Sequence, residues 1–389
     1  MPRLRFPEGV DAESFLHLIW QRKPLLMRAA LPELHCPIDP DELAGLACEP
    51  EVESRIVLER GDTPWELRHG PFEPEAFASL PPSHWTLLVQ DVEKHVPEVA
   101  RLLDAFRFIP DWRVDDVMIS YAADQGSVGP HVDQYDVFLV QAMGRRRWLI
   151  DTRPQDQAPL REDTDLRVLA EFQAEREWVL EPGDVLYLPP GVAHWGIAEQ
   201  PCMTCSVGYR APALRELLSA WCEHLIERTD PGRHYRDPPA EPQTFSAEIA
   251  PTTLDAVGAL LERLQSADTR ERSRWFGRFA TEVKPHLAPA PPVEPLDPAS
   301  LHEAWRAHGV IRRHPYSRAA FAAIEADHLT LFVNGQDYAL PQLCRGFVKA
   351  VAHERELHFG YLDEWLAHPA CLETLTALYN AGALVFADD

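Results

Sequence analysis

The sequence predicts an α+β protein with a small antiparallel β-sandwich or barrel at its centre. Three observations predict this class. Short apolar segments punctuated by Gly and Pro clusters occupy residues 114–210, which is typical of a sandwich or barrel. Segments with apolar residues at helical spacing lie on both sides of that region. A proline-dense stretch, 284–300, then separates a shorter region of helices and a hairpin, so we expect more than one domain.

Residues 1–110 are predicted to be mixed. Apolar residues recur at helical spacing over 12–20, and Pro24 ends that helix before a short buried strand at 25–27. Further amphipathic helices are expected at 39–46, 74–80 and 97–106. The last two begin with a proline, which suits the first helical position. Such helices commonly cover one side of a β-domain.

The central region contains six clear strand candidates. Each is a short apolar run bounded by turn residues. They occupy residues 117–121, 137–142, 147–150, 178–180, 185–188 and 203–209.

Helices are predicted again after residue 213. Three apolar stripes within 213–283 either pack on the β-domain or form a dimer interface, and the pattern leaves both readings open. Beyond the proline-dense stretch, residues 328–340 form a predicted hairpin with an Asn-Gly turn, and helices flank it at 341–353, 361–367 and 371–381. Together with a possible final strand at 384–386, these elements resemble a winged-helix module. The expected domains are 1–212, 213–284 and 285–389.

Composition limits the partners. The chain has 61 acidic and 37 basic residues and a net charge of −24, which disfavours general nucleic-acid binding and suits a basic partner. On charge alone, an ordinary acidic soluble protein is an equal alternative. The helix-and-hairpin region also has no basic, aromatic-rich recognition helix. Seven scattered cysteines argue against a disulfide framework. Because no apolar run is long enough to span a bilayer and no signal core is seen, we expect a soluble cytoplasmic protein.

A His-x-Asp pair and a distant histidine form the candidate metal site. Residues i and i+2 of a strand point to the same side, so His131 and Asp133 are expected to share one face. His194 follows a strand and a tight Pro-Gly turn, and antiparallel pairing is expected to bring it beside this pair. Two imidazoles and one carboxylate bind Fe(II) and leave positions open for a 2-oxo acid and dioxygen.

A basic strand after this pair carries the candidate co-substrate contact. Within the run 145–147, Arg146 faces the side opposite to its two arginine neighbours. If Arg146 points inward, its guanidinium suits the distal carboxylate of a 2-oxo acid, and Ser120 on an earlier strand adds a hydroxyl. The alternative is three solvated arginines on an edge strand, which would be favoured without the neighbouring metal pattern.

Longer motifs surround these residues. They are G-P-H-V-D-Q-Y-D-V-F-L-V-Q-A-M-G-R-R-R-W (129–148), E-P-G-D-V-L-Y-L-P-P-G-V-A-H (181–194) and S-V-G-Y-R-A-P (206–212), with W-Q-R-K-P-L-L-M-R-A-A (20–30) before them. In these motifs the sequence resembles the JmjC-type ribosomal oxygenases, and among them the bacterial ribosomal protein arginine hydroxylases. The resemblance is specific over about residues 20–212.

The resemblance implies a fold and an activity. The fold is a double-stranded β-helix (cupin/JmjC) barrel with N-terminal helices, a helical dimerisation segment and a C-terminal winged-helix domain. The activity is hydroxylation of an arginine β-carbon on large-subunit ribosomal protein number sixteen, by a homodimer. The cofactor is Fe(II), with 2-oxoglutarate and dioxygen as co-substrates.

The resemblance also implies residue roles. The iron ligands fall on His131, Asp133 and His194, and the 2-oxoglutarate contacts on Arg146 and Ser120. Met203 is expected to line the same pocket. Asp124 and Tyr135 are candidates for holding the substrate guanidinium, with a loop charge and a packed aromatic ring as their plainer alternatives.

Other functions are kept as alternatives. The same chemistry on a histidine side chain is one. A metal-binding cupin sensor that reports to DNA through the winged-helix module is another. Cys202 and Cys205 have redox spacing, but residues i and i+3 of a strand face opposite sides, so a thioredoxin-like role is not expected.

Overall fold

The computed structural model describes residues 3–61, 63–153, 158–237, 239, 245, 247–266 and 268–386. These residues divide into two compact units, Met1–Ala211 and Pro212–Asp389. The first unit ends one residue before the predicted first boundary. The further boundary expected at 284/285 stays a prediction.

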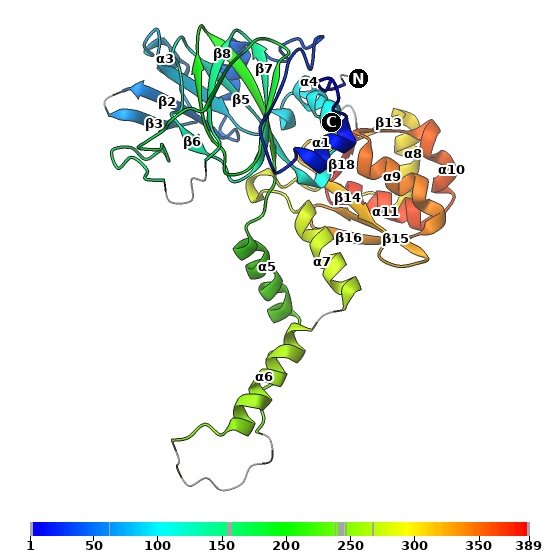
Figure 1. Ribbon diagram of the computed structural model, residues 1–389. Helices are drawn as coiled ribbons and strands as arrows, with labels where there is room; N and C mark the ends of the chain where they lie inside the picture. The colour runs from blue at the N-terminus through cyan, green and yellow to red at the C-terminus, as the bar shows by residue number, and fades with distance from the viewer. Residues whose placement is uncertain are drawn as a thin grey trace. The chain divides into compact units, whose positions relative to one another are not determined.

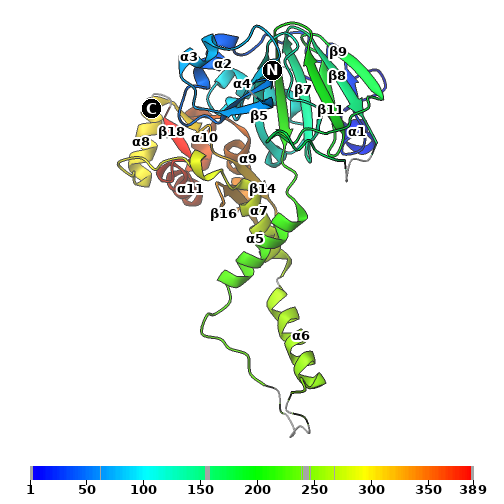
Figure 2. The same ribbon diagram turned by 90° about the vertical axis from the view of Figure 1, so that its left-hand side faces the viewer.

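Two antiparallel sheets form the first unit (Figure 1). The larger sheet has eight strands in the order β1-β10-β7-β12-β5-β4-β2-β3, and the smaller has four in the order β6-β11-β8-β9. Figure 2 shows β11, β8 and β9 of the smaller sheet side by side. The strands are β1 (Leu25–Met27), β2 (Ser54–Arg60), β3 (Pro64–His69), β4 (Trp85–Val89), β5 (Val114–Ala122), β6 (His131–Val132), β7 (Asp136–Met143), β8 (Arg146–Asp151), β9 (Arg176–Leu180), β10 (Val185–Leu188), β11 (Ala193–Ala198) and β12 (Cys202–Tyr209).

Strand β7 is buried on both faces, which explains its continuous apolar sequence. Val137 and Leu139 point between the two sheets, where they meet Trp148 and Ile150 of β8. The alternate residues of β7, led by Phe138, belong to the main core on the other face of the larger sheet. The predicted sandwich or barrel is therefore confirmed, with one core between the sheets and one outside them.

Short helices of the N-terminal region contribute to the outer core. Phe15 of α1 and Trp20, just after it, pack against Phe138 and Tyr187 with ring centroids 5.0–6.3 Å apart. These contacts bury aromatic surface that the eight-stranded sheet would otherwise expose. The helices are α1 (Ala12–Leu18), α2 (Pro40–Leu46), α3 (Pro74–Ala78) and α4 (Pro97–Ala100), with 3₁₀ turns η1 (Val92–Lys94), η2 (Arg101–Phe106) and η3 (Asp111–Arg113).

All six predicted central strands are present, but the prediction missed several others. Strands β2, β3 and β4 extend the larger sheet from the region expected to be mixed, where only the strand at 25–27 was predicted. The short strands β6 and β11, which carry the histidines, were also not delimited. A two-residue strand such as β6 has no periodicity of its own, and only its partner β11 defines it.

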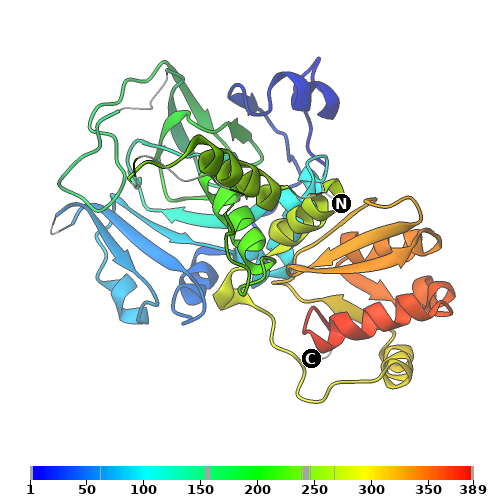
Figure 3. The same cartoon turned by 90° about the horizontal axis from the view of Figure 1, so that it is seen from below.

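The second unit combines helices with two three-stranded sheets, ordered β17-β13-β18 and β14-β15-β16. Helix α7 packs on the β14–β16 sheet, and α11 contacts β16. Figure 3 shows that sheet in orange with α11 in red beside it. The helices are α5 (Leu214–Glu227), α6 (Pro251–Gln265), α7 (Thr269–Thr281), α8 (Pro298–His308), α9 (Arg345–His353), α10 (Phe359–Leu366) and α11 (Pro369–Asn380), with turns η4 (Pro285–Leu287) and η5 (Gln342–Cys344). The strands are β13 (Val310–Arg313), β14 (Ala319–Ala322), β15 (His328–Val333), β16 (Gln336–Pro341), β17 (Glu356–His358) and β18 (Leu384–Phe386).

The predicted hairpin is confirmed as β15 and β16. Asn334 and Gly335 form its turn with φ values of 49° and 78°, the left-handed pair that a two-residue hairpin turn requires. Among the described residues, no helix combines the length and the apolar character needed to cross a membrane.

Candidate active site

The pairing of β6 with β11 brings the predicted metal ligands together. His131 lies directly opposite His194 in this antiparallel pair, and their ring centroids are 4.2 Å apart. Asp133 follows β6, and its Oδ2 atom lies 3.9 Å from Nε2 of His131 and 3.6 Å from Nε2 of His194. The ligand atoms of all three residues are within 4.8 Å of one another, as a single metal ion requires.

Backbone carbonyls orient both imidazoles. Nδ1 of His131 lies 2.9 Å from the carbonyl oxygen of Gly129, and Nδ1 of His194 lies 3.0 Å from that of Val192. A carbonyl only accepts hydrogen bonds, so each Nδ1 donates and each Nε2 keeps its lone pair for a metal. Gly129 adopts φ +80°, a conformation that side chains rarely tolerate, at the turn that presents this carbonyl.

His194 is held in its neutral form. Its side chain is buried, and burial, followed by the neighbouring His131, lowers the pKa of His194 to about 4. The carboxylate of Asp133 opposes this shift only partly. The imidazole of His194 is therefore uncharged at neutral pH, the form that binds a metal ion.

The triad opens into a cavity of about 400 Å³ between the two sheets. Its walls combine apolar side chains with a small number of polar groups, as is usual for small-molecule sites. Ser120, Arg146, Trp148 and Thr204 line the same cavity as the triad.

Arg146 is a buried cation whose hydrogen-bond partners among the described residues are neutral. Its side chain is 3% exposed, and its nitrogens lie 3.1 Å from Oγ of Ser120 and 3.5 Å from both Oγ1 of Thr204 and the carbonyl oxygen of Gly196. Within the described part of the chain, its Nε atom has no hydrogen-bond partner. Burial lowers the pKa of the Arg146 guanidinium from its usual value. A buried charge of this kind needs an anion to compensate it.

Strand alternation separates Arg146 from its neighbours, as predicted. Arg145 and Arg147 are partly exposed, and they lie 3.5 Å from Glu199 and 3.7 Å from Glu177 respectively. Arg146 points inward, with its guanidinium 5.1 Å from the ring centre of Trp148. The solvated-arginine alternative therefore does not describe Arg146.

The absence of a side chain at Gly196 leaves space for the Arg146 guanidinium and the Trp148 ring. A Cβ atom at Gly196 would lie 2.7 Å from the ring of Trp148 and 2.8 Å from Nε of Arg146. Both distances are shorter than any van der Waals contact allows. Residue 196 therefore has to be a glycine for the Arg146 guanidinium to keep its observed position.

Met203 does not reach the cavity, contrary to the expectation from the family resemblance. Its side chain is fully buried in the outer core, with its sulfur 3.9 Å from that of Cys36. The next residue of β12, Thr204, faces the cavity instead, together with Ser206. Because successive side chains of a strand point to opposite faces, Met203 points away from the cavity when Thr204 points into it.

Of the two residues predicted to hold the substrate guanidinium, Tyr135 lies at the cavity and Asp124 does not. Tyr135 lines the cavity and is 40% exposed, as expected for a residue at its mouth. Asp124 does not line this cavity, and its backbone carbonyl instead accepts a hydrogen bond from the amide of His84.

Sequence reasoning missed several lining residues. Asp116 on β5 is only 9% exposed and is the one buried acidic side chain of the described lining outside the triad. It lies four residues before Ser120 on the same strand face, so the period of two could have identified it. Arg55 and Gln90 also line the cavity, but they come from strands and turns that the sequence did not reveal.

Comparison with known proteins identifies the family. A model of the JmjC domain matches residues 101–217, a model of the ROXA-like winged helix matches residues 263–385, and a model of the AraC-like ligand-binding domain matches residues 172–276. The ribosomal protein uL16 3-hydroxylase of Escherichia coli (strain K12) is 36% identical over 375 residues, which are 96% of this chain and 97% of that protein. The chain belongs to the JmjC-domain ribosomal oxygenases.

Two further similarities agree with this family. A probable ribosomal oxygenase of Haemophilus influenzae is 39% identical over 213 residues, which are 54% of this chain and 52% of that protein. The solved structure of the ribosomal oxygenase YcfD from Escherichia coli, in complex with cobalt and 2-oxoglutarate, is 34% identical with a TM-score of 0.84, and all of both chains is covered. The fold of this JmjC ribosomal oxygenase is therefore the expected double-stranded β-helix followed by a winged-helix domain.

Proposed function

We propose that this chain is an Fe(II)- and 2-oxoglutarate-dependent oxygenase that hydroxylates an arginine side chain of the large-subunit ribosomal protein uL16. The observation that carries the proposal is one cavity that contains both the His131–Asp133–His194 triad and a buried arginine for which the described residues provide no acidic partner. The name of the Escherichia coli relative, a ribosomal protein uL16 3-hydroxylase, supports the substrate.

The donor set fits Fe(II). His131, Asp133 and His194 would hold the ion through two neutral imidazoles and one carboxylate, a combination typical of oxygenases of this class. When bound, iron supplies the activation of dioxygen that couples conversion of 2-oxoglutarate into succinate and carbon dioxide to insertion of one oxygen atom into a substrate C–H bond. The carbonyls of Gly129 and Val192 keep both imidazoles in the metal-binding orientation.

Arg146 would bind the distal carboxylate of 2-oxoglutarate. Its guanidinium offers paired N–H donors, and Ser120 and Thr204 add hydroxyls beside it. Nε of Arg146 and Nε1 of Trp148 are buried donors without partners among the described residues, and an anionic ligand would give them acceptors. Because these groups are already buried and oriented, binding would require little rearrangement.

Asp116 and Tyr135 would orient the substrate arginine. Both line the cavity, and the Asp116 carboxylate suits a guanidinium through a bidentate contact. The net charge of −24 favours approach by a basic ribosomal protein. A ribosomal substrate agrees with the cytoplasmic location that the sequence predicts.

A homodimer is the proposed assembly. Helices α5 and α6 expose apolar residues at helical spacing, which a second copy would cover. These residues are Leu214, Leu218 and Ile226 on α5, and Leu254, Val257, Leu261 and Leu264 on α6.

The test is a hydroxylation assay on purified uL16. The protein is incubated with uL16, Fe(II) and 2-oxoglutarate, and fragment mass spectrometry locates any added oxygen while succinate is measured in parallel. We expect one added oxygen on an arginine β-carbon, in step with succinate, and neither product without added metal. Absence of uL16-dependent oxygen and succinate would overturn the proposal.

The same assay separates the alternatives. Oxygen on a histidine of a ribosomal protein would establish the histidyl reading of the same chemistry. Salt-sensitive binding to duplex DNA, without turnover of any ribosomal protein, would favour the metal-dependent sensor.

A further inference from the structure

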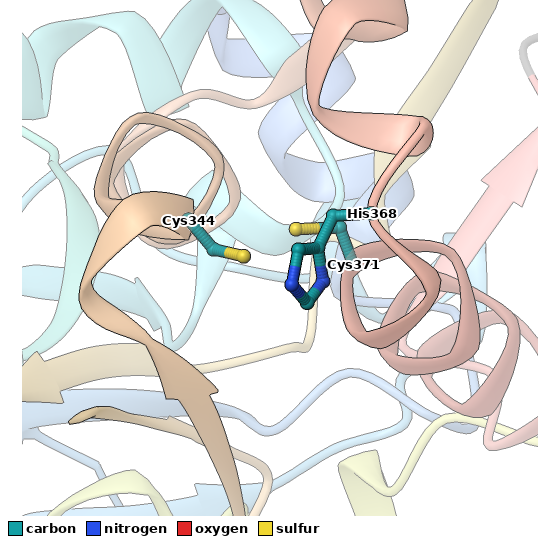
Figure 4. Close-up of side chains that lie close together, drawn as sticks. All are labelled: Cys344, His368 and Cys371. Atoms are coloured by element: carbon teal, nitrogen blue, oxygen red, sulfur yellow. The ribbon is translucent and has the colours of Figure 1, made fainter. Parts of the chain in front are cut away.

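The second unit contains a cluster of soft metal ligands far along the chain from the oxygenase triad. Cys344, His368 and Cys371 place two sulfurs and an imidazole within 4.8 Å of one another. Figure 4 shows the three side chains gathered between the turn that holds Cys344 and the helix that holds Cys371. We propose that these three residues form a zinc site that ties the start of α9 to the start of α11.

The donor chemistry selects the metal. Thiolate sulfur and imidazole nitrogen are the ligands that Zn²⁺ prefers, whereas Fe(II) oxygenase sites use histidine and carboxylate. With Zn–S bonds of about 2.3 Å and a Zn–N bond of about 2.0 Å, tetrahedral ligand atoms lie about 3.5–3.8 Å apart. The observed separations within 4.8 Å therefore require only small side-chain movements.

Both sulfurs lie at the beginning of a helix. Cys344 is the N-cap residue of α9, and Cys371 is the third residue of α11, after the N-cap residue His368. Helix N-termini stabilise anions such as thiolates. Burial and the contact with Cys344 raise the pKa of the Cys371 thiol, so the cation has to supply the remaining stabilisation of the thiolate.

His368 distinguishes this cluster from two ordinary core cysteines. Both cysteines are fully buried in the core of the second unit, where free thiols often serve only as small apolar groups. The imidazole adds a polar ligand at the same point and is partly exposed, which gives a path from solvent. Its Nδ1 atom accepts the amide of Ala370 at 3.3 Å, a long capping contact that coordination would replace or release.

Three protein ligands leave one tetrahedral position for water or another small ligand. The site would join two helices that are separated in sequence by the rest of α9, β17 and α10. Since the unfolded chain does not preorganise these ligands, zinc should stabilise the folded unit.

Cobalt provides a direct test on the full chain. The reduced, metal-free protein is titrated with Co²⁺ and then with Zn²⁺. Cobalt bound to thiolate absorbs strongly in the near ultraviolet, and the triad, which has no sulfur, does not contribute to that band. We expect the band to form and to be displaced by zinc.

Variants test whether the cobalt–thiolate band comes from Cys344 and Cys371. In Cys344→Ala/Cys371→Ala the band should disappear and bound metal should fall by one ion per chain, whereas Cys222→Ala, which removes an exposed thiol, should keep both. His368→Asn retains a helix-capping side chain and should weaken zinc binding by about tenfold or more. Circular dichroism confirms that each variant folds.

A thermal readout completes the test. In a His131→Ala background, zinc should raise the unfolding temperature, and adding Cys344→Ala/Cys371→Ala should remove that rise. Three results would overturn the site: no thiolate band in the wild-type chain, a band that persists in the double-cysteine variant, or a Cys344–Cys371 disulfide whose reduction yields no metal binding. The wild-type titration and His368→Asn decide the question even if the double variant misfolds.

Discussion

Individual side chains determine what the oxygenase cavity can bind. The triad offers a metal three ligands, and Arg146 brings a buried positive charge whose hydrogen-bond partners in the described part of the chain are neutral. In the proposed function these features are complementary: the triad would bind the cation, and Arg146 would bind the distal end of a dianionic co-substrate. A site that contained only one of them would not specify 2-oxoglutarate.

Replacing His131 tests the metal assignment. His131→Ala removes one of three ligands, so we expect loss of metal-dependent succinate formation and weaker metal binding at the triad. Because His131 is only partly buried, the unfolding temperature without metal should change little. Unchanged turnover in this variant would remove the triad from the mechanism.

Replacing Arg146 tests the co-substrate contact. Arg146→Ala removes hydrogen bonds to a charged group, each worth about 1.5–3 kcal/mol, so the 2-oxoglutarate concentration for half-maximal rate should rise about tenfold or more. Initial rates over a range of 2-oxoglutarate concentrations measure this. Arg147→Ala, on the outward face of the same strand, is the matched control and should leave the requirement unaltered.

Gly196 offers a subtler test of the same contact. Gly196→Ala places a methyl group against Trp148 and Arg146, so we expect a several-fold higher 2-oxoglutarate requirement and about 1–3 kcal/mol lower stability from overpacking. The control is Gly258→Ala on α6, where an added Cβ meets open space. An unaffected 2-oxoglutarate requirement would show that the Arg146 guanidinium tolerates displacement.

Among the elements, β12 shows that alternate side chains of one strand serve the core and the candidate site. Its odd-numbered side chains, Met203, Cys205 and Val207, enter the outer core, while Thr204 and Ser206 face the cavity. The pairings of β12 with β5 and β7 fix this choice, because a one-residue slip would invert every side chain.

A pair of neighbouring substitutions tests this alternation. Met203→Ala should cost about 2–5 kcal/mol of stability through the cavity it creates, with little change in the 2-oxoglutarate requirement. Thr204→Val should raise that requirement a few-fold with a smaller loss of stability, because it removes a hydroxyl beside Arg146. Chemical denaturation and steady-state kinetics on both variants measure the two effects. The opposite pattern would place Met203 in the co-substrate pocket after all.

For the whole molecule, the exposed apolar faces of α5 and α6 are the basis of the proposed dimer. Leu218→Glu and Leu261→Glu together should convert the proposed dimer into a monomer, because two charges would enter an apolar interface. Sedimentation or light scattering measures the change. Val293→Glu, at a fully exposed position outside both helices, should leave the mass unchanged. A wild-type chain that is already monomeric at high concentration would end the dimer proposal.

Two metals in one chain would serve different purposes if the Cys344–His368–Cys371 site is correct. The triad lies in a cavity, where a co-substrate can reach the ion, whereas the cysteine pair is fully buried between helices. Ligand type keeps the two apart, since sulfur favours zinc and the histidine–carboxylate set favours iron.

The sequence by itself predicted the class of fold and the main residues of the candidate site. His131, Asp133, His194 and Arg146 could be named in advance because strand alternation and a few Gly-Pro turns are local features, and because the surrounding motifs resemble those of a known family. Local spacing also located the hairpin at Asn334–Gly335.

Only the tertiary structure decided which face of each strand is inside. It placed Thr204 rather than Met203 at Arg146, removed Asp124 from the cavity and added Asp116. It also joined the two-residue β6 to β11 and brought Cys344 to His368 and Cys371. These outcomes depend on pairing register and on contacts between distant segments, and no periodicity within a single segment encodes them.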